Sequence, residues 1–118
     1  MRMIRVAVTA LLLAGAAAPA ALGHAGVAGT NPAAGAVVTR LPKVVTITFT
    51  EVVARAGACT VTHNGLNFGM RARLNPADHH QLRITTRGGT AAGSYTVRWR
   101  VTATDGHRMG GRFGFRVR

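Results

Sequence analysis

The chain has 118 residues, which is enough for one domain and not for two. It carries 15 Lys and Arg residues against 3 Asp and Glu, a formal net charge of +12. Its single cysteine, Cys59, excludes an intramolecular disulfide, so packing has to stabilise the fold. Cys59 shares the apolar phase of its predicted strand with Val61, and we expect it to be a small buried hydrophobe, with a copper(I) or redox role as the alternative.

The first 23 residues have the layout of a secretory signal peptide. Arg2 and Arg5 form a basic region, a run rich in Ala and Leu follows, and small residues precede a cut after Gly23. The apolar run is short for a membrane span, although an uncleaved anchor is the alternative. Cleavage would leave residues 24–118 as one domain of 95 residues with a net charge of +10 and His24 at its start.

Alternation of apolar and polar residues predicts strands in the rest of the chain. Each predicted strand has one apolar face and one face of Thr and Arg, as in antiparallel sheets with one side in water. The clearest examples are residues 45–50, 82–85, 95–104 and 112–118, and helical periodicity is absent from 24–118. The pattern predicts an all-β, Ig-like Greek-key β-sandwich or barrel of about seven strands.

Turn signals separate these strands. Residues 31–35 form one predicted turn, and the Asn-Gly pair in 63–65 predicts a hairpin because it tolerates positive φ. We expect His63, at the start of that hairpin turn, to be exposed and not a metal ligand. Residues 75–78 predict another turn, which could open one short helical turn. His79 and His80 follow in a predicted loop, where solvated side chains are favoured over a second metal site.

Asp105 and His107 lie two positions apart at the end of the longest predicted strand. Residues i and i+2 of a strand point the same way, so these two side chains can aim at one point. Gly106 between them allows the backbone to bend. The spacing alone is a weak signal, because an Asp in so basic a chain pairs easily with an arginine.

His24 strengthens the case for a metal site. As the first residue of a cleaved chain it would carry an α-amine with a pKa of about 7.7–8.0, so a metal can displace its proton near neutral pH. The amine and the imidazole Nδ1 close a chelate ring. With His107 as a third nitrogen and Asp105 as an oxygen, the set suits tetragonal Cu(II). The alternative is that His24 merely follows the cleavage site and is solvated.

Four segments of the chain form a specific pattern in a fixed order. They read H-A-G-V-A-G-T-N-P-A-A-G-A-V-V, L-P-K-V-V-T-I-T-F-T-E, G-S-Y-T-V-R-W-R-V-T-A-T-D-G-H and G-G-R-F-G-F-R-V. This pattern resembles the CopC family of periplasmic copper-binding proteins, with a loose match over residues 55–90. The resemblance implies a cupredoxin-like Greek-key fold and Cu(II) bound by the amine and imidazole of His24, Asp105 and His107. It also implies a carrier or buffer of copper, not an enzyme, often beside an inner-membrane copper-uptake partner.

The chain departs from the family pattern at several positions. After the predicted cleavage only Met70 and Met109 remain as thioethers, which argues against a Cu(I) site of the methionine-rich kind. Met109 lies two residues after His107; packing in the core is favoured over an approach to the metal. Arg108 follows D-G-H where the family often has proline, so it would place a cation beside the site or pair with Asp105. Glu51 occupies the family's F-x-E position, and we expect a structural ion pair there.

The leading hypothesis is therefore a periplasmic Cu(II)-binding protein that buffers or carries copper. One alternative is a basic Ig-like interaction module without metal. Another is a histidine-brace copper monooxygenase, which the apolar-phase aromatic residues and the Asp105 ligand disfavour. The arginines alternate along strands and do not cluster, so we expect a solvated basic face and no nucleic-acid partner. An acidic membrane surface or an acidic membrane protein is a candidate partner for that face.

Overall fold

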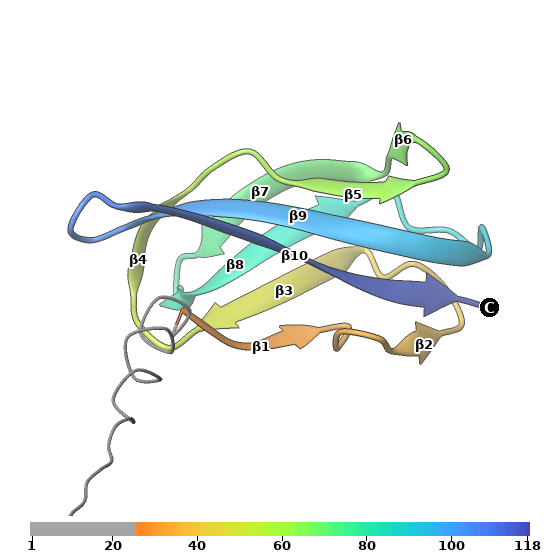
Figure 1. The fold of residues 1–118 in the computed structure, drawn as a ribbon, viewed down its shortest axis with the longest axis horizontal. Helices are drawn as coiled ribbons and strands as arrows, with labels where there is room; N and C mark the ends of the chain where they lie inside the picture. Colours follow the sequence, from red (N-terminus) through yellow and green to blue (C-terminus); the bar gives the residue numbers. More distant parts are fainter. Residues whose placement is uncertain (1–25) are drawn as a thin grey trace, which may run out of the picture.

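The structure is a computed structural model that describes residues 26–118, and these residues form ten β-strands in two sheets (Figure 1). The predicted signal peptide and His24 lie outside the described residues. The first sheet has the order β1-β3-β8-β7, with strands Val27–Asn31, Val44–Phe49, Asp78–Thr86 and Gly69–Asn75. The second has the order β2-β10-β9-β5-β6, with strands Val37–Val38, Arg108–Val117, Gly93–Ala103, Thr60–His63 and Leu66–Asn67.

The remaining strand is β4 (Val53–Ala56). It pairs with the end of β9 that leads into the turn to β10. β5 pairs with β9 further along, so one long strand holds two short partners. These short segments explain why the strands outnumber the seven that the sequence predicts. No helix forms within 26–118, and none there could cross a membrane.

The apolar faces of the two sheets meet in one core, as the alternating pattern predicts. Burial alternates residue by residue along β3 and through most of β9, so each strand turns its Thr and Arg face away from the core. The all-β sandwich is confirmed. The buried apolar residues are Leu41, Val45, Ile47, Phe49, Val53, Val61, Leu82, Ile84, Tyr95, Val97, Trp99, Val101, Phe115 and Val117.

Two predicted turns form hairpins. Asn64 and Gly65 have φ of 51° and 78°, the positive values that an Asn-Gly hairpin turn requires. The turn between β7 and β8 pairs Asn75 with Asp78 and has no helical turn, contrary to one expectation. As a result Asp78 begins β8, and the two histidines after it lie on a strand and not in a loop.

His63 is buried, and the expectation that it is exposed is wrong. Only 6% of its surface is accessible. Its ring stacks on Tyr95 with centroids 4.3 Å apart, and its Nδ1 lies 2.8 Å from the Ser94 carbonyl oxygen. Its Cε1 would lie 2.8 Å from a Cβ at Gly93, where φ is +128°. A glycine at this position therefore makes room for the histidine at the strand end.

Gly111 makes similar room for the one tryptophan. The Trp99 ring packs edge-on against Phe49 with centroids 5.1 Å apart, and a Cβ at Gly111 would lie 2.7 Å from Trp99 Cζ2. We expect Gly111→Ala to lower the free energy of unfolding by about 1–3 kcal/mol, because the indole has to shift within a packed core. Urea denaturation followed by Trp99 fluorescence measures this change. Gly29→Ala is the matched control, since a Cβ there meets nothing within 4 Å. Equal losses in the two variants would contradict the prediction.

Candidate metal centre

Asp105 and His107 lie in the turn that connects β9 to β10. This long hairpin extends to the end of the molecule opposite the C-terminus (Figure 1). Inside the turn the Ala103 N–H donates to the His107 carbonyl at 2.7 Å, and the Gly106 N–H donates to the Ala103 carbonyl at 2.9 Å. Gly106 has a φ of +92°, a value that favours glycine. The turn therefore fixes the backbone on both sides of the two side chains.

The structure brings these two side chains into direct contact. The His107 backbone N–H donates to Asp105 Oδ1 at 3.0 Å, and His107 Nδ1 lies 2.9 Å from Asp105 Oδ2. The two side chains meet because Asp105 forms a turn, in which its carboxylate accepts a hydrogen bond from the backbone N–H two positions later. The sequence suggested instead that strand alternation would point them the same way. The hydrogen bond from the His107 backbone, and then the one from its ring, lower the pKa of the Asp105 carboxyl.

The pair is exposed and available to a ligand. The His107 side chain is 82% accessible and the Asp105 side chain 65%. Because the carboxylate occupies Nδ1, the ring presents Nε2 to solvent. A histidine whose second nitrogen is held by a carboxylate has a fixed orientation and a more basic ligand nitrogen, as in many metal sites.

The expected arginine pairs do not form. Within the described part of the chain both ion pairs join an aspartate to a histidine, Asp105 to His107 and Asp78 to His80. Asp105 does not pair with Arg108, and Glu51 is exposed and forms no ion pair with any residue from 26 to 118. The expectation of a structural ion pair at Glu51 is therefore wrong for these residues.

Two groups are too few for a metal centre by themselves. Between residues 26 and 118 no three His, Cys, Asp or Glu side chains lie close enough to hold an ion. A metal at Asp105 and His107 would need further ligands, and the predicted ligand His24 lies outside the described residues.

The described chain begins beside the base of this hairpin. A Cβ on Gly26 would lie 3.7 Å from Met109 Cε, and the Gly26 carbonyl accepts from the Thr50 N–H at 2.8 Å. Met109 follows His107 by two positions, and Gly26 follows His24 by two. Two residues span at most about 7 Å. If the chain is cleaved before His24, its first residue can therefore be no more than about 7 Å from Gly26.

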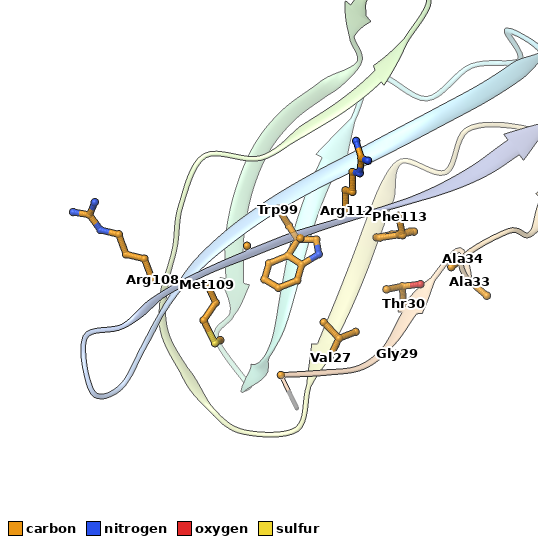
Figure 2. A pocket seen from close by; sticks show the side chains of 13 residues that line it. Val27, Gly29, Thr30, Ala33, Ala34, Trp99, Arg108, Met109, Arg112 and Phe113 are labelled. Carbon is orange, nitrogen blue, oxygen red and sulfur yellow. The ribbon is translucent and has the colours of Figure 1, made fainter. Parts of the chain in front are cut away.

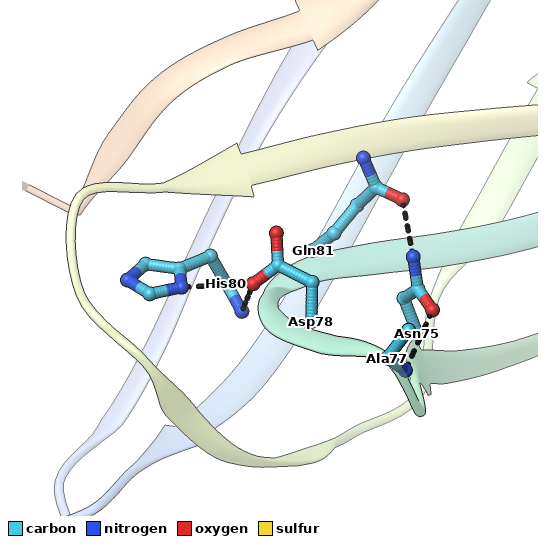
Figure 3. Close-up of polar contacts among 5 residues, drawn as sticks. All are labelled: Asn75, Ala77, Asp78, His80 and Gln81. Atoms are coloured by element: carbon cyan, nitrogen blue, oxygen red, sulfur yellow. Dashed lines mark hydrogen bonds and ion pairs between the residues drawn. The ribbon is translucent and has the colours of Figure 1, made fainter.

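A second Asp–His pair has a similar geometry at the start of β8 (Figure 3). The His80 N–H donates to Asp78 Oδ1 at 3.0 Å, and His80 Nδ1 lies 2.9 Å from the same oxygen. The D-x-H spacing of this pair is visible in the sequence, but the prediction of a loop with solvated histidines did not join Asp78 to His80. His79 beside it is exposed, and the second pair also lacks a third ligand among residues 26–118.

The sulfur-containing side chains near the hairpin pack against the protein. Cys59 is half-buried against the core, with Sγ 3.5 Å from the Gly57 carbonyl and 3.9 Å from the Arg100 carbonyl. Burial raises the pKa of the Cys59 thiol, so the neutral thiol is favoured. Met109 is half-buried and packs against the same core, as expected.

The two-sheet sandwich and the Asp–His hairpin together define a class: an all-β, cupredoxin-like domain without a helix among its described residues. Residues 27–118 match the CopC domain. The chain therefore belongs to the CopC family, as its sequence motifs indicated. That family consists of copper resistance proteins and not of enzymes.

Individual relatives agree with this assignment. Protein YobA of Escherichia coli strain K12 is 32% identical over 120 residues, covering 99% of this chain and 96% of its own. The crystal structure of CopC from Methylosinus trichosporium OB3b has a TM-score of 0.69 and 26% identity, covering 80% of this chain and 93% of that one. PcoC, a methionine-rich copper resistance protein from Escherichia coli, shares the fold with a TM-score of 0.67 and 22% identity, covering 79% and 97%.

Proposed function

We propose that this protein is a periplasmic Cu(II)-binding protein that buffers or carries copper, with one mononuclear site formed by His24, Asp105 and His107. The observation that carries the proposal is the exposed Asp–His pair on the β9–β10 hairpin, beside the point where the described chain begins. In this proposal copper is cargo, and delivery takes it to an inner-membrane copper-uptake protein.

The ligand set explains how so basic a protein would hold a cation. The cleaved chain has a net charge of +10, 13 basic against 3 acidic residues, which repels free Cu(II), so binding has to come from chelation and not from charge attraction. The amine and imidazole of His24 supply two nitrogens and His107 Nε2 a third, a set that Cu(II) prefers among divalent ions. Both Asp105 oxygens accept hydrogen bonds from His107, so Asp105 binds copper through its remaining lone pairs or after its Oδ2 releases Nδ1.

The terminal amine is the most specific part of the proposal, and it can be tested alone. We compare a chain that begins at His24 with one that carries a single extra alanine before it. The first is expected to bind one Cu(II) with a nitrogen-rich tetragonal EPR spectrum. The extended chain is expected to lose that spectrum, because its amine no longer closes a chelate ring with the His24 imidazole. Identical spectra from the two chains, or no binding by either, would exclude the proposed site.

A further inference from the structure

Arginine side chains gather on the outer face of the second sheet, although the sequence suggested that they do not cluster. Cross-strand pairing creates the gathering: Arg112 lies opposite Arg98 on the neighbouring strand. All of these arginines are exposed and none pairs with a carboxylate in the described chain. We call this surface the basic face; it consists of Arg55, Arg98, Arg100, Arg108, Arg112 and Arg116.

One edge of the same sheet is open. β10 pairs with β9 along its whole length, but β2 covers its other edge only near the C-terminus, at Arg116 and Val117. Gly114 accepts from Gly35 and Arg116 donates to Ala36 across that covered part. Backbone groups alternate in direction along an antiparallel strand. The N–H and C=O groups of residues 108, 110 and 112 therefore point outward at the uncovered part, where the described residues give them no partner.

An apolar groove runs beside this edge, between β10 and β1, with a volume of about 760 Å³ (Figure 2). Its apolar lining includes Val27, Trp99, Met109 and Phe113, while the side chains of Arg108 and Arg112 point away from it. β1 is the last strand of the first sheet, so its outer edge is also uncovered by any described strand. The edges of β10 and β1 thus border the groove. The basic face is on the opposite side of β10.

We propose that the open edge of β10, residues 108–112, binds an extended acidic segment of a partner protein by strand addition. The backbone of the segment pairs with the outward N–H and C=O groups. Side chains of an added strand alternate between two faces. Apolar residues of the segment would enter the groove beside Trp99, and acidic residues would lie on the basic face beside Arg98 and Arg112.

Backbone pairing is what separates this partner from other polyanions. An anionic lipid surface or a nucleic acid would satisfy the charge of the basic face, but neither offers N–H and C=O groups at strand spacing. A nucleic acid would also leave the apolar groove empty. The combination of edge, groove and charge therefore favours a peptide segment, and the proposal stands whether or not copper is bound.

The test uses the chain that begins at His24, which keeps the entire core from Leu41 to Val117. The probe is a capped peptide of alternating Glu and Val, about eight residues long, which is a typical strand length. Its control has the same sequence with alternate amides N-methylated, so that it keeps the charge but cannot pair along β10. We expect fluorescence anisotropy to show that the first peptide binds and that the control binds at least tenfold more weakly. The loss of one backbone hydrogen bond between peptide and β10 already lowers affinity by up to about tenfold. Equal binding of the two peptides, or no binding, would overturn the proposal.

A pair of variants tests the position on the protein. Arg112→Ala removes a charge, whereas Arg112→Pro removes the same charge and also the outward N–H. Proline is tolerated where a strand edge faces solvent, so the ladder with β9 should remain. We expect Arg112→Pro to bind the probe about tenfold more weakly than Arg112→Ala.

Amide hydrogen exchange locates the contact without any substitution. Saturating peptide is expected to slow exchange at Gly110 and Arg112 by about tenfold or more. Unchanged exchange at these amides would overturn the proposal. So would tight binding to phosphatidylglycerol vesicles combined with no binding of the peptide, because the basic face would then be a lipid-binding surface.

Discussion

Replacing His107 by glutamine is expected to weaken Cu(II) binding by more than about 100-fold, since loss of an outer partner of a metal ligand already costs about 10–100-fold. Glutamine keeps a similar size and polarity but removes the imidazole nitrogen that faces solvent. The side chain is 82% accessible, so the substitution leaves the core unchanged. Competition of the variant against a chelator of known Cu(II) affinity measures the loss.

The second Asp–His pair provides an internal control for this prediction. His80 contacts Asp78 in the arrangement that joins His107 to Asp105, and it is also on a hairpin. If copper binds wherever an exposed Asp–His pair occurs, His80→Gln weakens binding as much as His107→Gln. If the hairpin beside the start of the chain carries the site, His80→Gln leaves the affinity unchanged. A loss in His80→Gln alone would move the site to β8 and contradict our assignment.

The fold could be predicted because its strands are half-buried and alternate strictly. Along β9 the apolar residues Tyr95, Val97, Trp99 and Val101 are all buried, as their spacing indicates. An alternating strand specifies its own inward face, so the core follows from the sequence without knowledge of strand pairing. The Asn-Gly hairpin is similarly local, since its backbone requirement is met by two adjacent residues.

Properties that depend on pairing between strands could not be predicted from these patterns. The burial of His63 depends on Gly93 and Tyr95, which are about 30 residues away in the chain. The basic face depends on the register that places Arg98 opposite Arg112. The sequence separates these residues, and only the antiparallel ladder between β9 and β10 brings the charges together.

The candidate metal centre was partly visible from the sequence. The D-G-H spacing singled out Asp105 and His107, and the structure joins them through a hydrogen-bonded turn. The same D-x-H spacing at Asp78 and His80 did not show that a similar Asp–His contact forms at the start of β8. Motif spacing therefore identifies candidate ligands, whereas the choice between two similar pairs depends on where a third ligand can reach.

Tyr95→Ala is expected to destabilise the domain most, by about 3–5 kcal/mol of unfolding free energy. Tyr95 is 1% exposed and lies between two rings, with centroids 4.3 Å from His63 and 5.6 Å from Phe115. Alanine would leave a large cavity between the sheets and unstack both rings. A domain of this size has a total stability of only about 5–15 kcal/mol, so a substantial unfolded fraction is expected at 37 °C. Urea denaturation followed by the fluorescence of Trp99 measures the change.

Tyr95→Phe separates ring packing from the hydroxyl contribution. The Tyr95 hydroxyl donates to the Ala91 carbonyl at 2.7 Å, and burial raises the pKa of the phenol, so this donor stays protonated at neutral pH. Phenylalanine keeps the stacked ring and loses one hydrogen bond, with an expected cost of about 0.5–1.5 kcal/mol. A cost for Tyr95→Phe as large as that for Tyr95→Ala would place the stabilisation in the hydroxyl. The stacked rings of His63, Tyr95 and Phe115 would then contribute little to the stability of the contact between the end of β5 and the start of β9.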